Sequence, residues 1–265
     1  MSQLLMFDDR TPSHETPLSY FGAKPKDFLG VLSQYLPHNL KEMASPFVGG
    51  GRIELQLAAQ GIDVYASDTL EPLIQFFSSF LDDASAVCHR TAELCPLSKE
   101  EIIHYRCTHF EELSELDTAA IFWLMSKQTF LAMICSQKTN YSQRYSDKLK
   151  PGRFLKDKWV NWQNKYFHIE YSDCFDAIEK HKTKFLYCDP PYVGKEQCYG
   201  WFDGDQTFDH EKLSLMLKEH EAPWILSYGD HEIIRELYKD YKIIEPTWHY
   251  YTSNKKSSEL MIVNV

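Results

Sequence analysis

A glycine-rich turn between two predicted strands is the feature that most constrains the fold of this chain. Lys41–Ala44 predicts a short strand, and Ser45–Gly51, with three consecutive glycines at its end, follows it. The helical stretch Arg52–Gln60 comes next, and Ile62–Asp68 then predicts a second strand that ends in an acid. This order is typical of a nucleotide-binding βαβ unit, so we predict an α/β fold with a parallel sheet.

The turn and the acid after it also predict a binding site for a cofactor. Glycines let the backbone approach a ligand, and the N-terminus of the following helix faces that ligand. The candidates in the turn are Gly49 and Gly51, and Asp68 lies seventeen residues beyond Gly51. A carboxylate at a strand end can accept both hydroxyls of a ribose, and Phe47 can pack on an adenine ring. The alternative interpretation is a tight turn followed by an ordinary surface acid.

A second motif, Asp189-Pro190-Pro191-Tyr192, follows the apolar run Phe185–Cys188, which predicts a buried parallel strand. These residue types suit methyl transfer to an exocyclic amine, because hydrogen-bond acceptors can draw the delocalised lone pair back onto nitrogen. The Asp189 carboxylate and the Pro190 carbonyl are the predicted acceptors, and the paired prolines hold that carbonyl in place. Tyr192 offers a flat face for a base swung out of its stack. The alternative is a proline-stiffened loop.

Length and composition favour one α/β domain with an inserted module. The sequence has no run of about 18 apolar residues and no apolar signal-peptide centre, so we expect a soluble cytoplasmic protein with no membrane partner. Its seven cysteines include no Cys-x-x-Cys pair, which is weak ground for zinc or a disulfide framework. We therefore expect no metal and interpret the cysteines as reduced core residues.

Charge is unevenly distributed along the chain. The net charge of -10 argues at first against a nucleic-acid partner, because phosphate contacts need Lys and Arg. Between Lys138 and Lys165, however, eight basic residues stand against only Asp147 and Asp157, with aromatic residues interleaved. Such a mixture indicates nucleic-acid binding, although a solvated face is the common alternative. The DNA-binding candidates are Lys138, Arg144, Lys148, Lys150 and Arg153.

Helical patterns replace strand patterns between about residues 82 and 165. Ser98 and Glu101 resemble a capping box, and Thr118–Leu131 forms a further helical pattern. The α/β pattern then returns with predicted strands at Phe185–Cys188, Trp224–Tyr228, Lys242–Glu245 and Glu259–Val265, and predicted helices at Asp209–Glu219 and Glu232–Lys239. We therefore predict a catalytic domain over 1–81 and 166–265, interrupted by a helical insert over 82–165.

Upstream of the turn, Tyr20 and Lys24 stand on either side of Gly22, where a lysine can meet the carboxylate of an amino-acid moiety. In their order and spacing these motifs resemble the Dam family of adenine-specific DNA methyltransferases over nearly the whole chain, from about Leu18. The resemblance implies S-adenosylmethionine as the methyl donor. It also implies a Rossmann-like, seven-stranded methyltransferase sheet with a terminal hairpin, and a helical target-recognition insert. The positions implied to contact or lie near the cofactor are Tyr20, Lys24, Asp68, Tyr171, Asp173 and Asp189.

The implied activity is methyl transfer to N6 of adenine in double-stranded DNA, with base flipping and direct in-line displacement. Neither a metal nor a covalent intermediate is required, and we expect a monomer. Two alternatives stay open: an RNA amino-methyltransferase, a class that generally lacks a long insert, and a non-catalytic DNA-binding protein of the same fold. A restriction-modification role is open beside a phage or a housekeeping one.

Three positions depart from the family pattern. The family usually has Asp or Glu where this chain has Ser45, which leaves open what meets the amino group of the cofactor. Ala23 replaces a glycine, a minor change if its φ stays negative. The stretch Arg144–Gly152 is shorter than the recognition hairpin of GATC-reading members. We expect Arg144 and Lys148 in this shortened hairpin to read bases, and a target other than GATC or a looser version of it.

Overall fold

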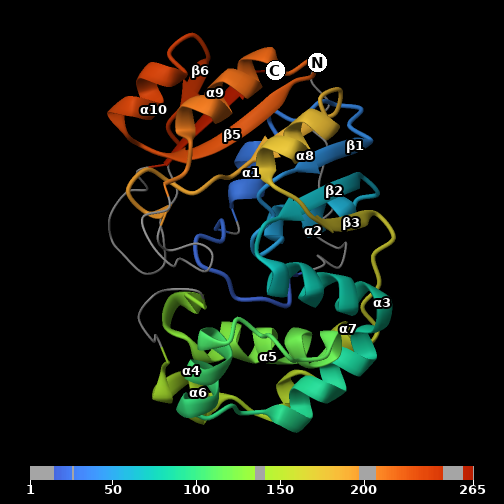
Figure 1. The fold of residues 1–265 in the computed structure, drawn as a ribbon. Coiled ribbons are helices and arrows are strands. Elements are labelled where there is room, and N and C mark those ends of the chain that lie inside the picture. The colour runs from blue at the N-terminus through green and yellow to red at the C-terminus, as the bar shows by residue number, and fades with distance from the viewer. Residues whose placement is uncertain (1–14, 26, 135–140, 197–206, 247–258, 265) are drawn as a thin grey trace.

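The structure is a computed structural model that describes residues 15–25, 27–134, 141–196, 207–246 and 259–264 (Figure 1). In these ranges the strands form one seven-stranded sheet with the order β3-β2-β1-β4-β5-β7-β6. The strands are β1 (Glu42–Ser45), β2 (Asp63–Asp68), β3 (Phe167–Tyr171), β4 (Phe185–Cys188), β5 (Trp224–Gly229), β6 (Lys242–Ile244) and β7 (Glu259–Asn264). Strands β1 to β5 pair in parallel, whereas β7 pairs antiparallel with β5 and β6. The predicted α/β methyltransferase sheet with its terminal hairpin is therefore confirmed.

Helices cover both faces of this sheet. Successive side chains of a strand point to opposite faces, so the continuous apolar run of β4 serves two cores. Phe185 and Tyr187 pack in one core, while Leu186 and Cys188 pack in the other. The first core is covered by α1 (Phe28–Leu32), α2 (Arg52–Ala58) and α3 (Glu71–Leu94), and the second by α8 (Cys174–Lys180), α9 (His210–Glu219) and α10 (Glu232–Leu237). This three-layer arrangement leaves the strand ends free to build a site.

A group of helices lies beyond α3, away from the sheet (Figure 1). It contains α4 (Lys99–Cys107), α5 (Glu115–Gln128), α6 (Gln143–Lys148) and α7 (Asp157–Val160), with the 3-10 turns η1 (Phe130–Ala132) and η2 (Pro151–Arg153). Helix α3 joins it to the sheet and is kinked at Asp83, one residue after the predicted start of the insert. Phe80 of α3 packs edge-on against Trp123 of α5, with the ring centroids 5.5 Å apart. We keep 82–165 as the proposed insert.

N-capping serines mark where two helices of this group begin. The predicted capping box is confirmed, because Glu101 N–H donates to Ser98 Oγ at 3.1 Å and Ser98 N–H donates to Glu101 Oε2 at 2.7 Å. Helix α5 begins at Glu115, three residues before the predicted Thr118, because Ser114 Oγ accepts the backbone N–H of Asp117. In the part of the chain that the structure describes, no helix has both the length and the apolar character needed to cross a membrane.

Two expectations are wrong. Residues 143–148 form helix α6 and not part of a hairpin, and Gln143 Nε2 donates to Asp147 Oδ1 at 2.7 Å, an i,i+4 pair that favours a helix. The cysteines are not all core residues, since Cys107 is exposed. It lies five residues after Ile102, which is buried in the same helix, so the two side chains point in different directions.

Candidate active site

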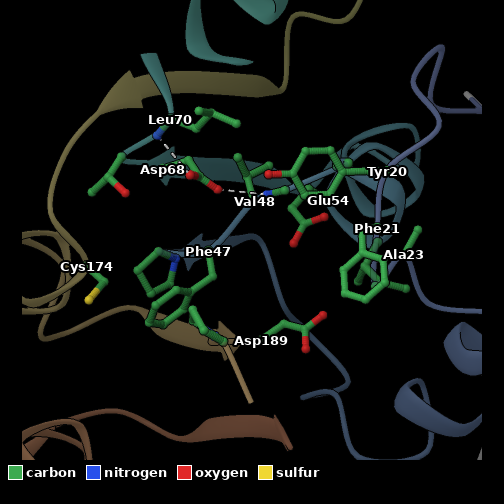
Figure 2. Close-up of a pocket in the computed structure, with 18 of the residues that line it drawn as sticks. Tyr20, Phe21, Ala23, Phe47, Val48, Glu54, Asp68, Leu70, Cys174 and Asp189 are labelled. Carbon is green, nitrogen blue, oxygen red and sulfur yellow. Dashed lines mark hydrogen bonds between the residues drawn. The ribbon is translucent and has the colours of Figure 1, made fainter. Parts of the chain in front are cut away.

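A cavity of about 480 Å³ lies at the carboxyl ends of β1, β2 and β4 (Figure 2). Strand β1 pairs with β2 on one side and with β4 on the other, so the chain reverses its direction of winding here. Ligands of open α/β sheets bind at such a switch point. The predicted site residues that line this cavity are Tyr20, Lys24, Phe47, Gly49, Gly51, Asp68, Asp173, Asp189 and Pro191.

The glycine turn brings backbone, rather than side chains, to the cavity. Gly51 is the N-cap of α2 and has a φ of 65°, in the left-handed region that other residues rarely adopt. A Cβ at Gly50 would lie 2.7 Å from Cβ of Tyr20. Tyr20 therefore packs directly on the turn, and the two segments form one wall of the cavity.

Asp68, at the end of β2, holds this turn in place. Its Oδ2 accepts the backbone N–H of Gly49 at 3.1 Å, and its Oδ1 accepts that of Leu70 at 3.1 Å (Figure 2). Burial raises the pKa of the Asp68 carboxyl, and these backbone N–H groups oppose the rise. Each carboxylate oxygen has a second lone pair, so the side chain can still accept two hydroxyls.

Asp189, at the end of β4, is bonded to a buried lysine. Lys24 is only 3% exposed, and its Nζ donates to Asp189 Oδ1 and to the Tyr192 hydroxyl, both at 2.6 Å. The Tyr192 hydroxyl also donates to Asp189 Oδ1 at 3.3 Å. Burial raises the pKa of the Asp189 carboxyl, while the positive charge of Lys24 lowers it. The ammonium thus orients the carboxylate that the sequence predicts to be catalytic.

Glu54, in the first turn of α2, lines the cavity although the sequence analysis did not select it. Its side chain is 3% exposed, and its Oε1 accepts the hydroxyl of Ser45 at 2.7 Å. Burial raises the pKa of the Glu54 carboxyl to about 7. The sequence signal that could have found Glu54 is the serine at position 45, where the family usually has an acid, because another acid follows nine residues later. Among the other missed lining residues, Phe208 packs edge-on against Phe47, with ring centroids 5.7 Å apart.

Three predicted residues do not line the cavity. Tyr171 at the end of β3 is 63% exposed. Pro190 is buried, and Tyr192 is 8% exposed and packs against Tyr228. By contrast, Asp173 lines the cavity and caps α8 by accepting the backbone N–H of Phe175 at 2.8 Å. Among the residues that the structure describes, no three His, Cys, Asp or Glu side chains form a group that could hold a metal ion.

The basic candidates lie on the outside of the helical group. Arg144 and Lys148 are exposed on α6, and Lys150 and Arg153 are exposed at η2. Lys138 lies outside the described residues.

A partly buried lysine of the helical group contacts the segment that leads to Tyr20. Lys127 of α5 donates to Ser19 Oγ at 3.0 Å. Burial lowers the pKa of the Lys127 ammonium to about 7, and the positive charges of Arg153, Arg52 and Lys158 lower it further. Of these basic residues, Arg52 also lines the cavity.

Comparison with known proteins identifies one family. A family model described as D12 class N6 adenine-specific DNA methyltransferase matches residues 20–252. Two solved structures of the rRNA methyltransferase aviRa from Streptomyces viridochromogenes are similar to the chain at 13% identity. They cover 94% and 92% of this chain and 88% and 85% of their own chains, with TM-scores of 0.37 and 0.35.

Proposed function

Because this chain belongs to the D12 class N6 adenine-specific DNA methyltransferase family, we propose that it methylates N6 of an adenine flipped out of double-stranded DNA, with S-adenosylmethionine as the donor. Family membership makes the chain an adenine-specific DNA methyltransferase enzyme. We propose the identity of the methyl donor, the duplex form of the DNA and the flipping of the base. The observation that carries them is that Asp189 lines the same cavity as the glycine turn and Asp68.

The cavity fits the proposed donor in size and in chemistry. Its volume lies within the range of about 300 to 1,000 Å³ that is usual for small-molecule sites. Asp68 would hold the ribose hydroxyls, and Phe47 would pack on the adenine ring. Lys24 donates to Asp189 and Tyr192 and lies 4.0 Å from Glu259 Oε2, and its third N–H would meet the carboxylate of the methyl donor. When bound, the donor supplies a methyl group on a positively charged sulfonium, which is a good leaving system.

The remaining chemistry belongs to Asp189 and the residue after it. Oδ1 of Asp189 already accepts from Lys24 and Tyr192, so we assign Oδ2 as the acceptor for the adenine amine. The Pro190 carbonyl would accept the second N–H, and both contacts would draw the lone pair onto nitrogen. Pro190 is buried in this structure, so its carbonyl would have to become accessible when DNA binds. The N–C bond would form as the C–S bond breaks, the sulfur would leave as a neutral thioether, and the proton that the amine loses would pass to Oδ2 of Asp189. Preorganised acceptors of this kind need no reorganisation during transfer.

Binding of DNA is proposed for the helical group over 82–165. Arg144, Lys148, Lys150 and Arg153 are exposed there and can reach phosphates or bases. Tyr192 remains the proposed stacking partner of the flipped base. Its ring is buried in this structure, so it would have to become exposed when DNA binds.

The test is to incubate the protein with donor labelled in the methyl group and with duplex DNA, RNA or no nucleic acid. We expect label in DNA only, and no label with Asp189→Asn. Label in RNA alone would instead support an RNA amino-methyltransferase, and no label in either would support a non-catalytic protein. Long-read sequencing of DNA from a host expressing the protein would map the methylated base and its context. We expect a target other than GATC or a looser version of it, and methylation confined to GATC would contradict this.

A further inference from the structure

The cavity carries more negative charge than its own cations can balance. Its described lining residues include two cations, Lys24 and Arg52, and a larger set of acids: Glu54, Asp68, Asp173, Asp189 and Glu196. Lys24 is already bonded to Asp189 at 2.6 Å. The charge of Arg52 acts on Lys127 in the helical group. A ligand that brings its own positive charge therefore suits this cavity.

Glu54 is the acid best placed to use such a charge. Glu54 is 3% exposed, and its Oε1 accepts a hydrogen bond from a neutral group, the hydroxyl of Ser45, at 2.7 Å. The charges of Asp189 and Lys24 both act on it, so it lies close to the catalytic carboxylate. Figure 2 shows Glu54 on the wall of the cavity near Tyr20. A buried carboxylate in this position gains most from a ligand that offers both a charge and N–H donors.

We propose that Glu54 pairs with the α-ammonium group of the methyl donor, and that donor binding is therefore coupled to ionisation of Glu54. This inference rests on the proposed function. The α-carboxylate and the α-ammonium of an amino acid are attached to the same carbon, so they need a cation and an acid that are close together. Lys24 and Glu54 meet this need, and Asp68 at the end of β2 is left for the ribose. The sulfonium of the donor has no N–H, so it cannot make the hydrogen bonds that a buried carboxylate requires.

The coupling makes donor affinity depend on pH in a defined direction. Without ligand, burial raises the pKa of Glu54 to about 7, so the carboxyl takes up a proton as the pH falls below neutrality. Only the ionised form attracts an ammonium, and affinity should therefore fall by up to about tenfold for each pH unit below 7. At higher pH, near 8, the α-amino group of the donor begins to lose its own proton. Donor binding should thus be tightest slightly above neutral pH.

The experiment has to separate the titration of Glu54 from that of the groups around it. These groups are Ser45, Lys24, Asp189 and Tyr187. Burial holds the pKa of Tyr187 well above its usual range, so it does not titrate near neutrality. Asp189 can titrate because burial raises the pKa of its carboxyl too. Asp189→Asn is therefore included as a variant that should keep a fall in affinity, moved to lower pH because the negative charge of Asp189 raises the pKa of Glu54.

The experiment measures calorimetric affinity for two probes between pH 6 and 8. S-Adenosylhomocysteine keeps the α-ammonium, whereas 5′-methylthioadenosine lacks the whole amino-acid portion. Glu54→Gln keeps the shape of the side chain and should weaken S-adenosylhomocysteine by roughly 10- to 100-fold at pH 7.5. It should leave 5′-methylthioadenosine within about twofold and remove the fall in affinity below pH 7. Ser45→Ala should move that fall to higher pH, because it deletes a hydrogen bond that lowers the pKa of Glu54.

The outcomes separate this inference from the proposed function. If the wild-type protein binds neither probe, the proposed donor site fails. If it binds both and Glu54→Gln loses neither affinity nor pH response for S-adenosylhomocysteine, the assignment of Glu54 is overturned. The wild-type comparison also stands without any variant. Equal pH responses for the two probes would overturn the inference, even if Glu54→Gln did not fold.

Discussion

Replacing Asp189 with alanine should affect stability and catalysis together, because the carboxylate is the ion-pair partner of a buried ammonium. Lys24 is 3% exposed and Asp189 is 21% exposed, with 2.6 Å between Nζ and Oδ1. Removing one partner of a buried ion pair costs about 3 to 5 kcal/mol. Lys24 keeps its contact with the Tyr192 hydroxyl, so we expect the unfolding free energy to fall by about 3 kcal/mol. The loss of an acceptor for the amine should lower the methyl-transfer rate by about 100-fold or more.

Two companion variants separate these effects. Asp189→Asn keeps the shape of the side chain without its charge, and it should lose activity. Lys24→Met in the Asp189→Ala background removes the buried ammonium, whose remaining partners are the Tyr192 hydroxyl at 2.6 Å and Glu259 Oε2 at 4.0 Å. It should restore part of the lost stability but no activity. Urea unfolding gives the stability, and single-turnover transfer to duplex DNA gives the rate. Near wild-type turnover in Asp189→Ala would refute the proposed role of this carboxylate. No gain in stability from the added Lys24→Met would refute the ion-pair argument.

Three further variants test other parts of the site. Asp68→Ala should weaken donor binding by about 1 to 3 kcal/mol, since charged hydrogen bonds are lost, and calorimetry with unchanged affinity would favour a purely structural turn. Gly50→Ala should lower donor affinity because its Cβ would lie 2.7 Å from a tyrosine Cβ, whereas Gly152→Ala, which meets nothing within 4 Å, should not. Lys148→Ala should reduce the slope of log DNA affinity against log salt concentration by roughly one unit. Lys239→Ala, at an exposed lysine just after α10, is the control, and equal slopes for the two variants would remove α6 from the proposed DNA interface.

Much of the fold follows from short-range sequence patterns. The turn over Ser45–Gly51 predicts a switch from strand to helix because three glycines separate two periodic segments. The apolar run Phe185–Cys188 predicts a strand that is buried on both faces, and the structure confirms it at the same bounds. Strand β3 (Phe167–Tyr171) was not predicted directly from its residues. His168 and Glu170 interrupt its apolar residues and only Phe167 is fully buried, so its apolar signal is weak.

The sequence alone also predicts which residues gather at the strand ends. Asp68 is the last residue of β2 and Asp189 directly follows β4, and the parallel strands of one sheet bring such residues to the same edge. The motif order was enough to identify the family. Sequence reasoning could not show that Lys24 is paired with Asp189, because the two are 165 residues apart along the chain. Nor did it show that Tyr192 is buried, since its cover comes from β5.

The sequence by itself therefore determined the α/β class, the family and nine of the residues that line the cavity. The class follows from periodicity and turn chemistry, which act over a few residues, and the family follows from the order and spacing of motifs along the chain. The tertiary structure decided the ionic pairing of Lys24, the burial of Tyr192 and the selection of Glu54 as a cavity acid. Helix α2 places Glu54 next to Ser45, nine positions earlier, at a hydrogen-bonding distance of 2.7 Å. Burial and charge at one point in space depend on every segment that packs there, and no local pattern records them.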